Sequence, residues 1–328
     1  SLTGGGKFHI SWRSITGHRL EHHSSFRKWH KKIRHGGDSP YVSNNLRVRP
    51  YEVPDEMISG NLDWKVGMPL FSELIQSRKS RWWIKRDENP PWQSSLADKF
   101  SGIEWAKKQG VLTPEVIWTG NDISEMPMLS ELPKKIVIKP TKDFNANNVL
   151  CLNNGTNMLD GKVWNDQLIK EVFSSNEFLK RVNSNWIIEE FLQPELVTED
   201  ETIPRDFKFY CFGEEIAMIH VVLRNSTTNK SLNVRHYFSN DLRQFKKRIC
   251  ESRPVPKDPL FFPECWEEMV SQVKMLGKKL GCFMRIDMYA TNKGPVFGEF
   301  TATPEGGIGY SEWADKYLAT YWKGLEGG

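Results

Sequence analysis

The sequence predicts an α+β protein of two or three packed units. The chain has 328 residues, which is enough to bury more than one hydrophobic core. Its composition, 38% hydrophobic and 26% charged, is typical of a globular protein. After residue 133, short apolar runs with strand-like spacing alternate with segments of helical spacing. No apolar run approaches the roughly 18 residues of a membrane span, so we expect none.

Positive charge is concentrated at the beginning of the chain. Residues 1–50 contain ten Lys or Arg but only Glu21 and Asp38 as acids, a net charge of +8, so the remainder carries −4. We interpret residues 1–60 as a basic N-terminal arm with little regular structure. One interpretation is a solvated extension; the other is a binding surface for an anionic glycan, nucleic acid or lipid. The cluster matches no nucleic-acid-binding motif, which disfavours nucleic acid as a partner.

The five cysteines indicate a reducing environment. Their number is odd and none lie in a C-x-x-C pair. This usage is typical of small core residues rather than of a disulfide framework or zinc site. We therefore expect a cytoplasmic protein.

The first half of the chain predicts a helical region followed by three strands and a helical segment. Residues 61–132 mix helix and loop, with a helix over 95–109 that ends at Gly110. Strands are predicted over 136–139, 149–152 and 186–191, with helical spacing over 166–181.

The second half predicts two hairpins separated by a helix. Strands over 207–212 and 216–223 turn at Gly213, and strands over 283–290 and 296–302 turn through 291–294. A helix over 265–280 ends at Gly281, and a last helix covers 311–323.

The second hairpin predicts an acidic face. Alternation places Arg285 and Asp287 on one face of its first strand. We expect Phe297, Glu299 and Thr301 to share a face of its second strand. A turn centred between the strands sets Asp287 directly opposite Glu299, within cross-strand distance.

Two adjacent carboxylates require a neutralising cation. A salt-bridge network with Arg285 is one interpretation of this face. A Mg²⁺ site is the other, because Mg²⁺ accepts one or two carboxylates and completes its shell with phosphate oxygens and water. The glycine-rich segment 303–309 follows directly, and its backbone amides could approach an anion closely, which favours the metal site.

Cations occupy one face of the preceding strands. Lys139 ends an apolar strand. Lys208 is predicted to lie opposite His220, with Arg224 on the same face at the far end of that strand. Successive strands thus present cations, and the last hairpin presents carboxylates.

This ordered set resembles the ATP-grasp superfamily, and is most similar to the TupA-like ATP-grasp family. The resemblance covers roughly residues 90–325 and includes the Leu-Ala-Asp-Lys entry at 96–99. Its remaining motifs are Ile-Val-Ile-Lys-Pro (136–140), Ile-Ile-Glu-Glu-Phe-Leu (187–192), Asp-Phe-Lys-Phe-Tyr (206–210), Arg224, Arg-Ile-Asp (285–287) and Gly-Glu-Phe-Thr (298–301).

The resemblance implies an ATP-grasp fold, in which two α+β lobes clasp ATP after a reduced N-terminal domain at 61–132. It assigns residues 133–192 to the small lobe and residues 193–328 to the large lobe with the metal site. It implies phosphate contacts from three lysines: Lys99, Lys139 and Lys208. It also implies an adenine-binding hinge at Glu189, Glu190, Phe191 and Leu192, with Glu195 as a candidate ribose contact.

The resemblance further implies the metal and catalytic residues. Mg²⁺ would be held by Asp287, Glu299 and Thr301, where Thr301 replaces the amide that usually provides the third ligand. Arg224, Arg285 and Lys208 would stabilise the transferring phosphoryl group, because phosphoryl transfer depends on positioning and charge neutralisation.

Three functions are compatible with these residues. The first is an ATP-dependent carboxylate–amine ligase, which forms an acyl phosphate and attaches an amino acid or peptide to a peptide or acidic polysaccharide. The second is a kinase that phosphorylates a hydroxyl with the same metal and lysines; hydroxylamine trapping separates the two. The third is a non-catalytic module that binds an anionic polymer and ignores ATP.

Overall fold

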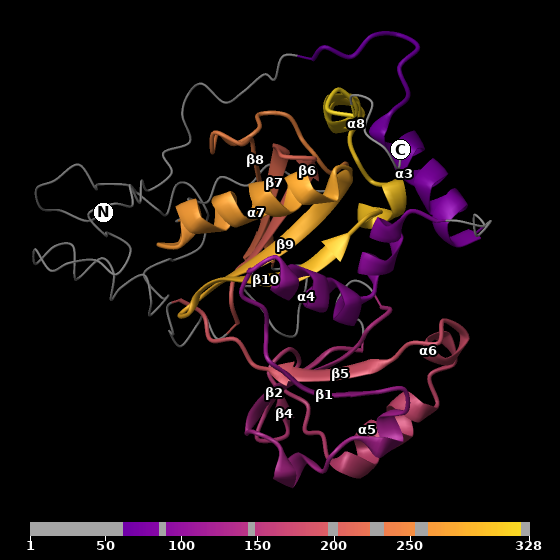
Figure 1. Ribbon diagram of the computed structural model, residues 1–328, viewed down its shortest axis with the longest axis vertical. Coiled ribbons are helices and arrows are strands. Elements are labelled where there is room, and N and C mark those ends of the chain that lie inside the picture. The colour runs from indigo at the N-terminus through magenta and orange to yellow at the C-terminus, as the bar shows by residue number, and fades with distance from the viewer. Residues whose placement is uncertain are drawn as a thin grey trace, which may run out of the picture.

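The computed structural model describes residues 62–84, 90–143, 148–195, 203–223, 233–252 and 262–322. Two antiparallel five-stranded sheets form two lobes, which Figure 1 shows one above the other. This arrangement confirms the predicted α+β class. The basic arm over residues 1–60 lies outside the described residues. No helix in the described ranges is long and apolar enough to cross a membrane.

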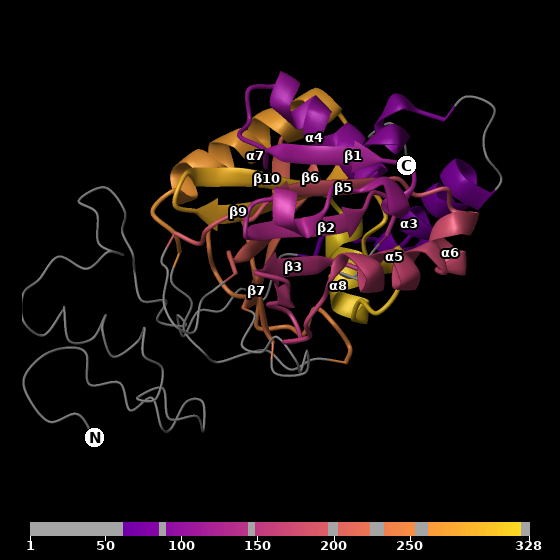
Figure 2. The ribbon, with the colours of Figure 1, turned by 90° about the horizontal axis from the view of Figure 1, so that it is seen from below.

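The first sheet has the strand order β1-β5-β2-β3-β4. Figure 2 shows four of its strands, β1, β5, β2 and β3, side by side. Its strands are β1 (Val116–Gly120), β2 (Lys135–Pro140), β3 (Leu150–Asn153), β4 (Thr156–Asn157) and β5 (Trp186–Glu190). Because β1 pairs with β5, this sheet recruits a segment from before residue 133, where sequence analysis begins the small lobe.

The helical segment over 166–181 is divided into α5 (Asp166–Ser174) and α6 (Glu177–Arg181). Asn176 causes the division, because its side chain accepts a hydrogen bond from the Leu179 amide and begins a new helix. Ile169 and Phe173 of α5 pack on the face of the first sheet that is turned away from the second lobe (Figure 1).

The second sheet has the order β10-β9-β6-β7-β8. It contains both predicted hairpins and adds β8 as an edge strand. Gly213, in the first turn, has φ +59, a left-handed conformation that glycine adopts without strain. The strands are β6 (Asp206–Phe212), β7 (Glu215–Leu223), β8 (Val234–Phe238), β9 (Phe283–Thr291) and β10 (Gly294–Thr301).

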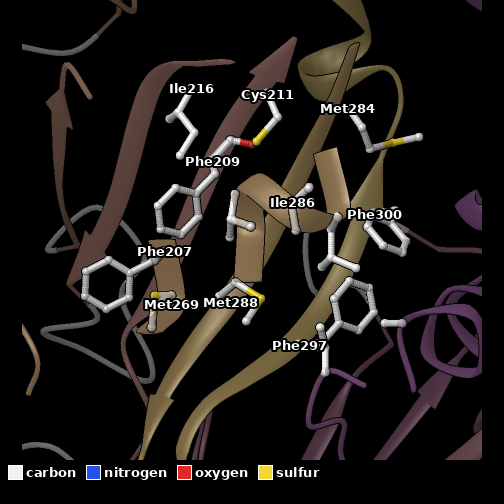
Figure 3. Packing of buried hydrophobic residues seen from close by; sticks show 14 of the residues in the cluster. Phe207, Phe209, Cys211, Ile216, Met269, Met284, Ile286, Met288, Phe297 and Phe300 are labelled. Atoms are coloured by element: carbon white, nitrogen blue, oxygen red, sulfur yellow. The ribbon is translucent and has the colours of Figure 1, made fainter. Parts of the chain in front are cut away.

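Helices α7 (Trp266–Leu280) and α4 (Lys99–Lys108) cover one face of this sheet. The α4 helix begins later than predicted, because a 3-10 turn occupies Trp92–Ala97 and the Asp98 side chain caps the Ser101 amide. Figure 3 shows the resulting core, in which apolar side chains of β6 and β9 lie near Met269 of α7.

The opposite face of the second sheet is divided in two. Helices α3 (Phe71–Lys79) and α8 (Glu312–Ala319) cover one end of it, where Phe71 and Leu318 pack with Phe212 and Phe283. The other end carries Asp206, Lys208, Asp287 and Glu299 in place of apolar residues. The region 61–132 is therefore shared, since α3 and α4 pack on the second sheet while β1 joins the first.

All five cysteines lie in the described residues and are free thiols. Burial raises the pKa of the Cys282 thiol to about 11.

Candidate active site

A row of polar side chains crosses the second sheet on its partly uncovered face. The register places Lys208 of β6 directly opposite Asp287 of β9, and Asp287 opposite Glu299 of β10. The predicted pairings of Lys208 with His220 and of Asp287 with Glu299 are both confirmed. Strands that are distant in the sequence therefore contribute to one site.

Asp287 lies between two cations. Lys208 Nζ is 2.8 Å from Asp206 Oδ2 and makes a short contact with Asp287 Oδ2. Arg285 binds Asp287 through Nε to Oδ1 at 2.7 Å and through Nη2 to Oδ2 at 2.8 Å. The Asp287 side chain is only 1% exposed, and a buried carboxylate is tolerated when cations compensate for its lost hydration.

Arg285 connects the residues that are candidate metal ligands. Its Nη2 also donates to Glu299 Oε1 at 3.1 Å and to Thr301 Oγ1 at 2.8 Å. Burial lowers the pKa of Arg285, but Asp287 and Glu299 outweigh burial and raise it well above its ordinary value. The guanidinium is thus a fixed positive charge within the acidic group.

Glu299 is the most accessible carboxylate of the row, with 34% of its side chain exposed. Burial alone would raise its pKa, but Lys99, Arg285 and Lys208 together hold that pKa below its ordinary value. Glu299 is therefore ionised at neutral pH and available as a ligand.

The prediction that Phe297 shares a face of its strand with Glu299 and Thr301 is wrong. The register shifts between Phe297 and Glu299, where Gly298 forms a bulge, so alternation is broken at this point. Phe297 lies in the hydrophobic core beside Phe300, as Figure 3 shows. Glu299 and Thr301 alone face the polar row. A Cβ at Gly298 would lie 2.9 Å from the Tyr289 ring and 3.0 Å from Asp287 O, so the close approach at the bulge requires glycine.

Lys99 connects the charges of the two lobes. Burial lowers the pKa of Lys99, Glu299 of the second sheet raises it, and Lys139 of the first sheet lowers it again, so the pKa is lowered overall. Lys139 Nζ itself is 2.7 Å from Glu189 Oε1 in a buried ion pair. The structure therefore brings Lys99, Lys139 and Glu299 into one electrostatic neighbourhood, while their nucleotide and metal roles remain predictions.

The predicted hinge begins at the end of β5. Glu189 pairs with Lys139, whereas Glu190 Oε2 is 2.6 Å from Lys293 Nζ in the β9–β10 turn. Phe191 and Leu192 follow as buried residues outside the strand. Because both glutamate side chains are engaged, adenine contacts from this segment would come from its backbone.

Glu195 contacts the approach to α7. Its Oε1 accepts a hydrogen bond from the Glu264 amide at 2.8 Å, and its own amide donates to Ala290 O. Burial raises the pKa of this carboxyl. The contact to ribose remains a prediction.

The residues fit a Mg²⁺ ion whose coordination shell is shared between the protein and the phosphates, rather than an ion enclosed by protein ligands alone. In the described part of the chain, no group of three or more His, Cys, Asp or Glu side chains is placed to hold a metal. Asp287, Glu299 and Thr301 provide oxygen atoms only, which Mg²⁺ prefers, and Mg²⁺ needs few protein ligands when phosphates supply the rest. These three residues would hold the ion.

Arg224 lies outside the described residues. We did not predict strand β8 from the sequence; its polar residues Arg235 and Tyr237 extend the site face. The alternation within Val-Arg-His-Tyr-Phe (234–238) was a signal that could have indicated it.

A sheet face with lysines, an arginine and paired carboxylates, together with a second lobe, agrees with the ATP-grasp architecture. The profile of one family, described as TupA-like ATPgrasp, matches residues 79–322. The chain therefore belongs to the TupA-like ATP-grasp family. Comparison with functionally curated proteins finds no match.

Solved structures of ATP-grasp ligases are distant neighbours. The ATP-grasp ligase PsnB complexed with a minimal precursor has 11% identity and a TM-score of 0.39, over 70% of this chain and 61% of that one. D-alanine–D-alanine ligase from Bacillus anthracis complexed with ATP has 15% identity and a TM-score of 0.40, over 70% and 67%. D-cycloserine synthetase DcsG has 13% identity and a TM-score of 0.39, over 69% and 68%. This chain thus spans less than two thirds of the PsnB structure.

Proposed function

We propose that this protein is an ATP-dependent carboxylate–amine ligase that forms an acyl phosphate and releases ADP and phosphate. The observation that supports it is the row of Lys208, Asp287 and Glu299 with Arg285 bound between the carboxylates. Membership of an ATP-grasp family supports ATP as the phosphoryl donor. The two substrates are a carboxylate and an amine carried by small molecules or peptides. Attachment to an acidic glycan remains a sequence-based prediction.

The proposed reaction has two steps. A carboxylate oxygen attacks the γ-phosphorus of ATP, the bond from that phosphorus to the β–γ bridging oxygen breaks, and ADP leaves with the electron pair. The amine nitrogen then attacks the acyl carbon, loses a proton, and expels phosphate.

The chain's own residues would act by positioning and charge. Arg285, Lys208 and Arg224 would stabilise the transferring phosphoryl group, and Lys99 and Lys139 would orient the other phosphates. The backbone of residues 189–192 would hold the adenine. Mg²⁺, when bound, would supply further neutralisation of phosphate charge. Loss of one such stabilising group typically lowers the rate about 100-fold or more.

The test is the change in melting temperature on addition of Mg-ATP, with native protein and Glu299→Gln. Ligand at 100 times its Kd adds about 2.7 kcal/mol to the free energy of unfolding, which is several degrees for a chain of this size. We expect a Mg²⁺-dependent shift that Glu299→Gln reduces. The matched control is Glu177→Gln, because the Glu177 side chain is 86% exposed on α6, and it should keep the shift.

No shift in the native protein at millimolar Mg-ATP would reject the proposal. If ATP binds, hydroxylamine distinguishes the chemistry, because an acyl phosphate gives a hydroxamate whereas a phosphorylated alcohol does not. ATP turnover with a phosphorylated alcohol as product would instead establish the kinase.

A further inference from the structure

The polar face of the second sheet continues beyond the proposed Mg-ATP residues onto β7 and β8. His220 of β7 lies opposite Lys208, and Tyr237 of β8 lies opposite His220. The row therefore runs without interruption from Glu299 at one edge of the sheet to Tyr237 at the other. No residue within β7 or β8 has a role in the proposed nucleotide contacts, although Arg224 directly follows β7.

His220 and Tyr237 form a flat wall. Their rings stack with centroids 4.5 Å apart and planes within 19° of parallel. His220 is almost fully covered, with 3% of the residue exposed, whereas Tyr237 is half-buried. The buried His220 ring therefore holds the Tyr237 ring in place, and Tyr237 provides the accessible part of the wall for an apolar or planar group.

Arg235 adds a positive charge beside this wall. It lies two residues before Tyr237 and so shares its face, opposite Val222. Burial raises the pKa of Tyr237 and Arg235 lowers it, which agrees with their proximity. The Nε atom of Arg235 is buried and has no hydrogen-bond partner in the described residues. The residue as a whole is half-buried, and a half-buried guanidinium attracts an anionic ligand through its remaining nitrogens.

The position and charge of Arg235 indicate which of the two substrates, the carboxylate or the amine, binds at β7 and β8. If the proposed function is correct, the charged side chains of β6, β9 and β10 contact the phosphates and Mg²⁺. The carboxylate substrate must then lie beside the γ-phosphoryl group. The adjacent strands on the same face are β7 and β8. A protonated amine would be repelled by Arg235, whereas a carboxylate would be attracted.

We propose that Arg235 and the His220–Tyr237 wall form the binding subsite for the carboxylate substrate, which carries an apolar or planar group next to its anionic end. This assignment rests on the proposed function. Arg235 binds the carboxylate, and the wall contacts the group attached to it.

The test measures hydroxamate formation from ATP, hydroxylamine and a panel of carboxylates in native protein and Arg235→Met. The panel contains the twenty amino acids, dipeptides, benzoate, succinate and glucuronate. Loss of a hydrogen-bonded ion pair should raise the carboxylate concentration for half-maximal rate roughly 10- to 100-fold. The KM for ATP and the Mg-ATP melting shift should not change. Arg235→Lys should recover part of the loss, because it restores the charge without the guanidinium geometry.

The control is Arg243→Met, an arginine just after β8 that is 48% exposed and pairs with Asp241. This variant should leave the KM for the carboxylate and the KM for ATP unchanged. An unchanged carboxylate KM in Arg235→Met, or an equal rise for carboxylate and ATP, would overturn the assignment.

A second measurement does not require turnover. The melting temperature of the Mg-ADP-loaded protein is recorded with each carboxylate of the panel. At least one should stabilise the native protein and Arg243→Met but not Arg235→Met. If Mg-ATP binds but no carboxylate of the panel does, the subsite is rejected while the nucleotide site stands. If Mg-ATP itself fails to bind, the proposed function is rejected.

Discussion

At the scale of single residues, burial determines which ionisable groups are paired. Asp287, Lys139 and Glu189 are buried charges, and each is within 2.8 Å of an opposite charge. His236 differs, because it is 0% exposed and neither ring nitrogen has a hydrogen-bond partner in the described residues. Burial lowers its pKa from 6.5 to about 4. His236 is therefore a neutral core residue of β8 at physiological pH.

His236 makes the free energy of unfolding depend on pH. Between pH 6.5 and 4 the unfolded chain binds a proton that the folded protein excludes, so stability decreases as the pH falls through this interval. Since one pKa unit corresponds to about 1.4 kcal/mol, His236 costs about 2 kcal/mol at pH 5 and almost nothing at pH 7.5.

His236→Phe should remove this cost. Denaturant unfolding of both proteins at pH 5 and 7.5 checks it: the variant should gain about 2 kcal/mol relative to native at the lower pH. An equal difference between the two proteins at both pH values would contradict the neutral, buried state of His236.

At the scale of elements, the β9–β10 hairpin owes its site geometry to the bulge at Gly298. The bulge turns Phe297 and Phe300 to the core and leaves Glu299 opposite Asp287. A side chain at this position would collide with Tyr289 and with the Asp287 backbone.

Gly298→Ala should therefore cost about 1–3 kcal/mol through overpacking and also weaken the Mg²⁺-dependent response to ATP, because Asp287 is displaced. Gly161→Ala is the control. Gly161 has φ +74 and open space around its Cβ position, so alanine there adds about 1–2 kcal/mol of left-handed strain only. The melting temperatures of the two variants are measured with and without Mg-ATP. A Mg²⁺-dependent shift in Gly298→Ala as large as in the native protein would refute the role of the bulge.

At the scale of the whole molecule, the two lobes meet along the segment after β5. The Glu190–Lys293 pair joins β5 to the β9–β10 turn, and the Asn292 amide donates to Gln193 O nearby. The pair is partly exposed, with Lys293 50% and Glu190 23% exposed, so it contributes only about 0–1 kcal/mol to global stability. We therefore expect loss of this pair to change the local opening of the junction between the lobes rather than the global free energy of unfolding.

Lys293→Met should accelerate amide hydrogen exchange over residues 191–195 and in the β9–β10 turn while lowering the melting temperature little. Lys278→Met is the matched control, because Lys278 pairs with Glu214, which lies in the same lobe. Mass-spectrometric exchange checks the prediction: a change spread over both lobes, or the same local change in the control, would show that the pair does not hold the junction.

Much of the fold could be predicted from local pattern alone. Period-2 runs indicated both hairpins, and glycines at 213 and 281 indicated where a strand and a helix end. The opposition of Asp287 and Glu299 followed from alternation and turn length. The family resemblance rested on the order of such short motifs, which sequence retains without any knowledge of contacts.

Other features depended on contacts that the sequence pattern does not reveal. The start of α4 depended on the Asp98 cap, and β1 joined the first sheet only through its pairing with β5. The core position of Phe297 depended on a bulge that the alternating pattern does not encode.

By itself, then, the sequence determined the α+β class, the ATP-grasp family and the residue types of the candidate site, because periodicity and motif order are local properties of the chain. The tertiary structure decided which charges pair, that Arg285 binds both carboxylates, and that Arg235, His220 and Tyr237 share the site face. The physical reason is that ion pairing and burial depend on distances between strands far apart in the chain, and these distances exist only once both sheets have formed.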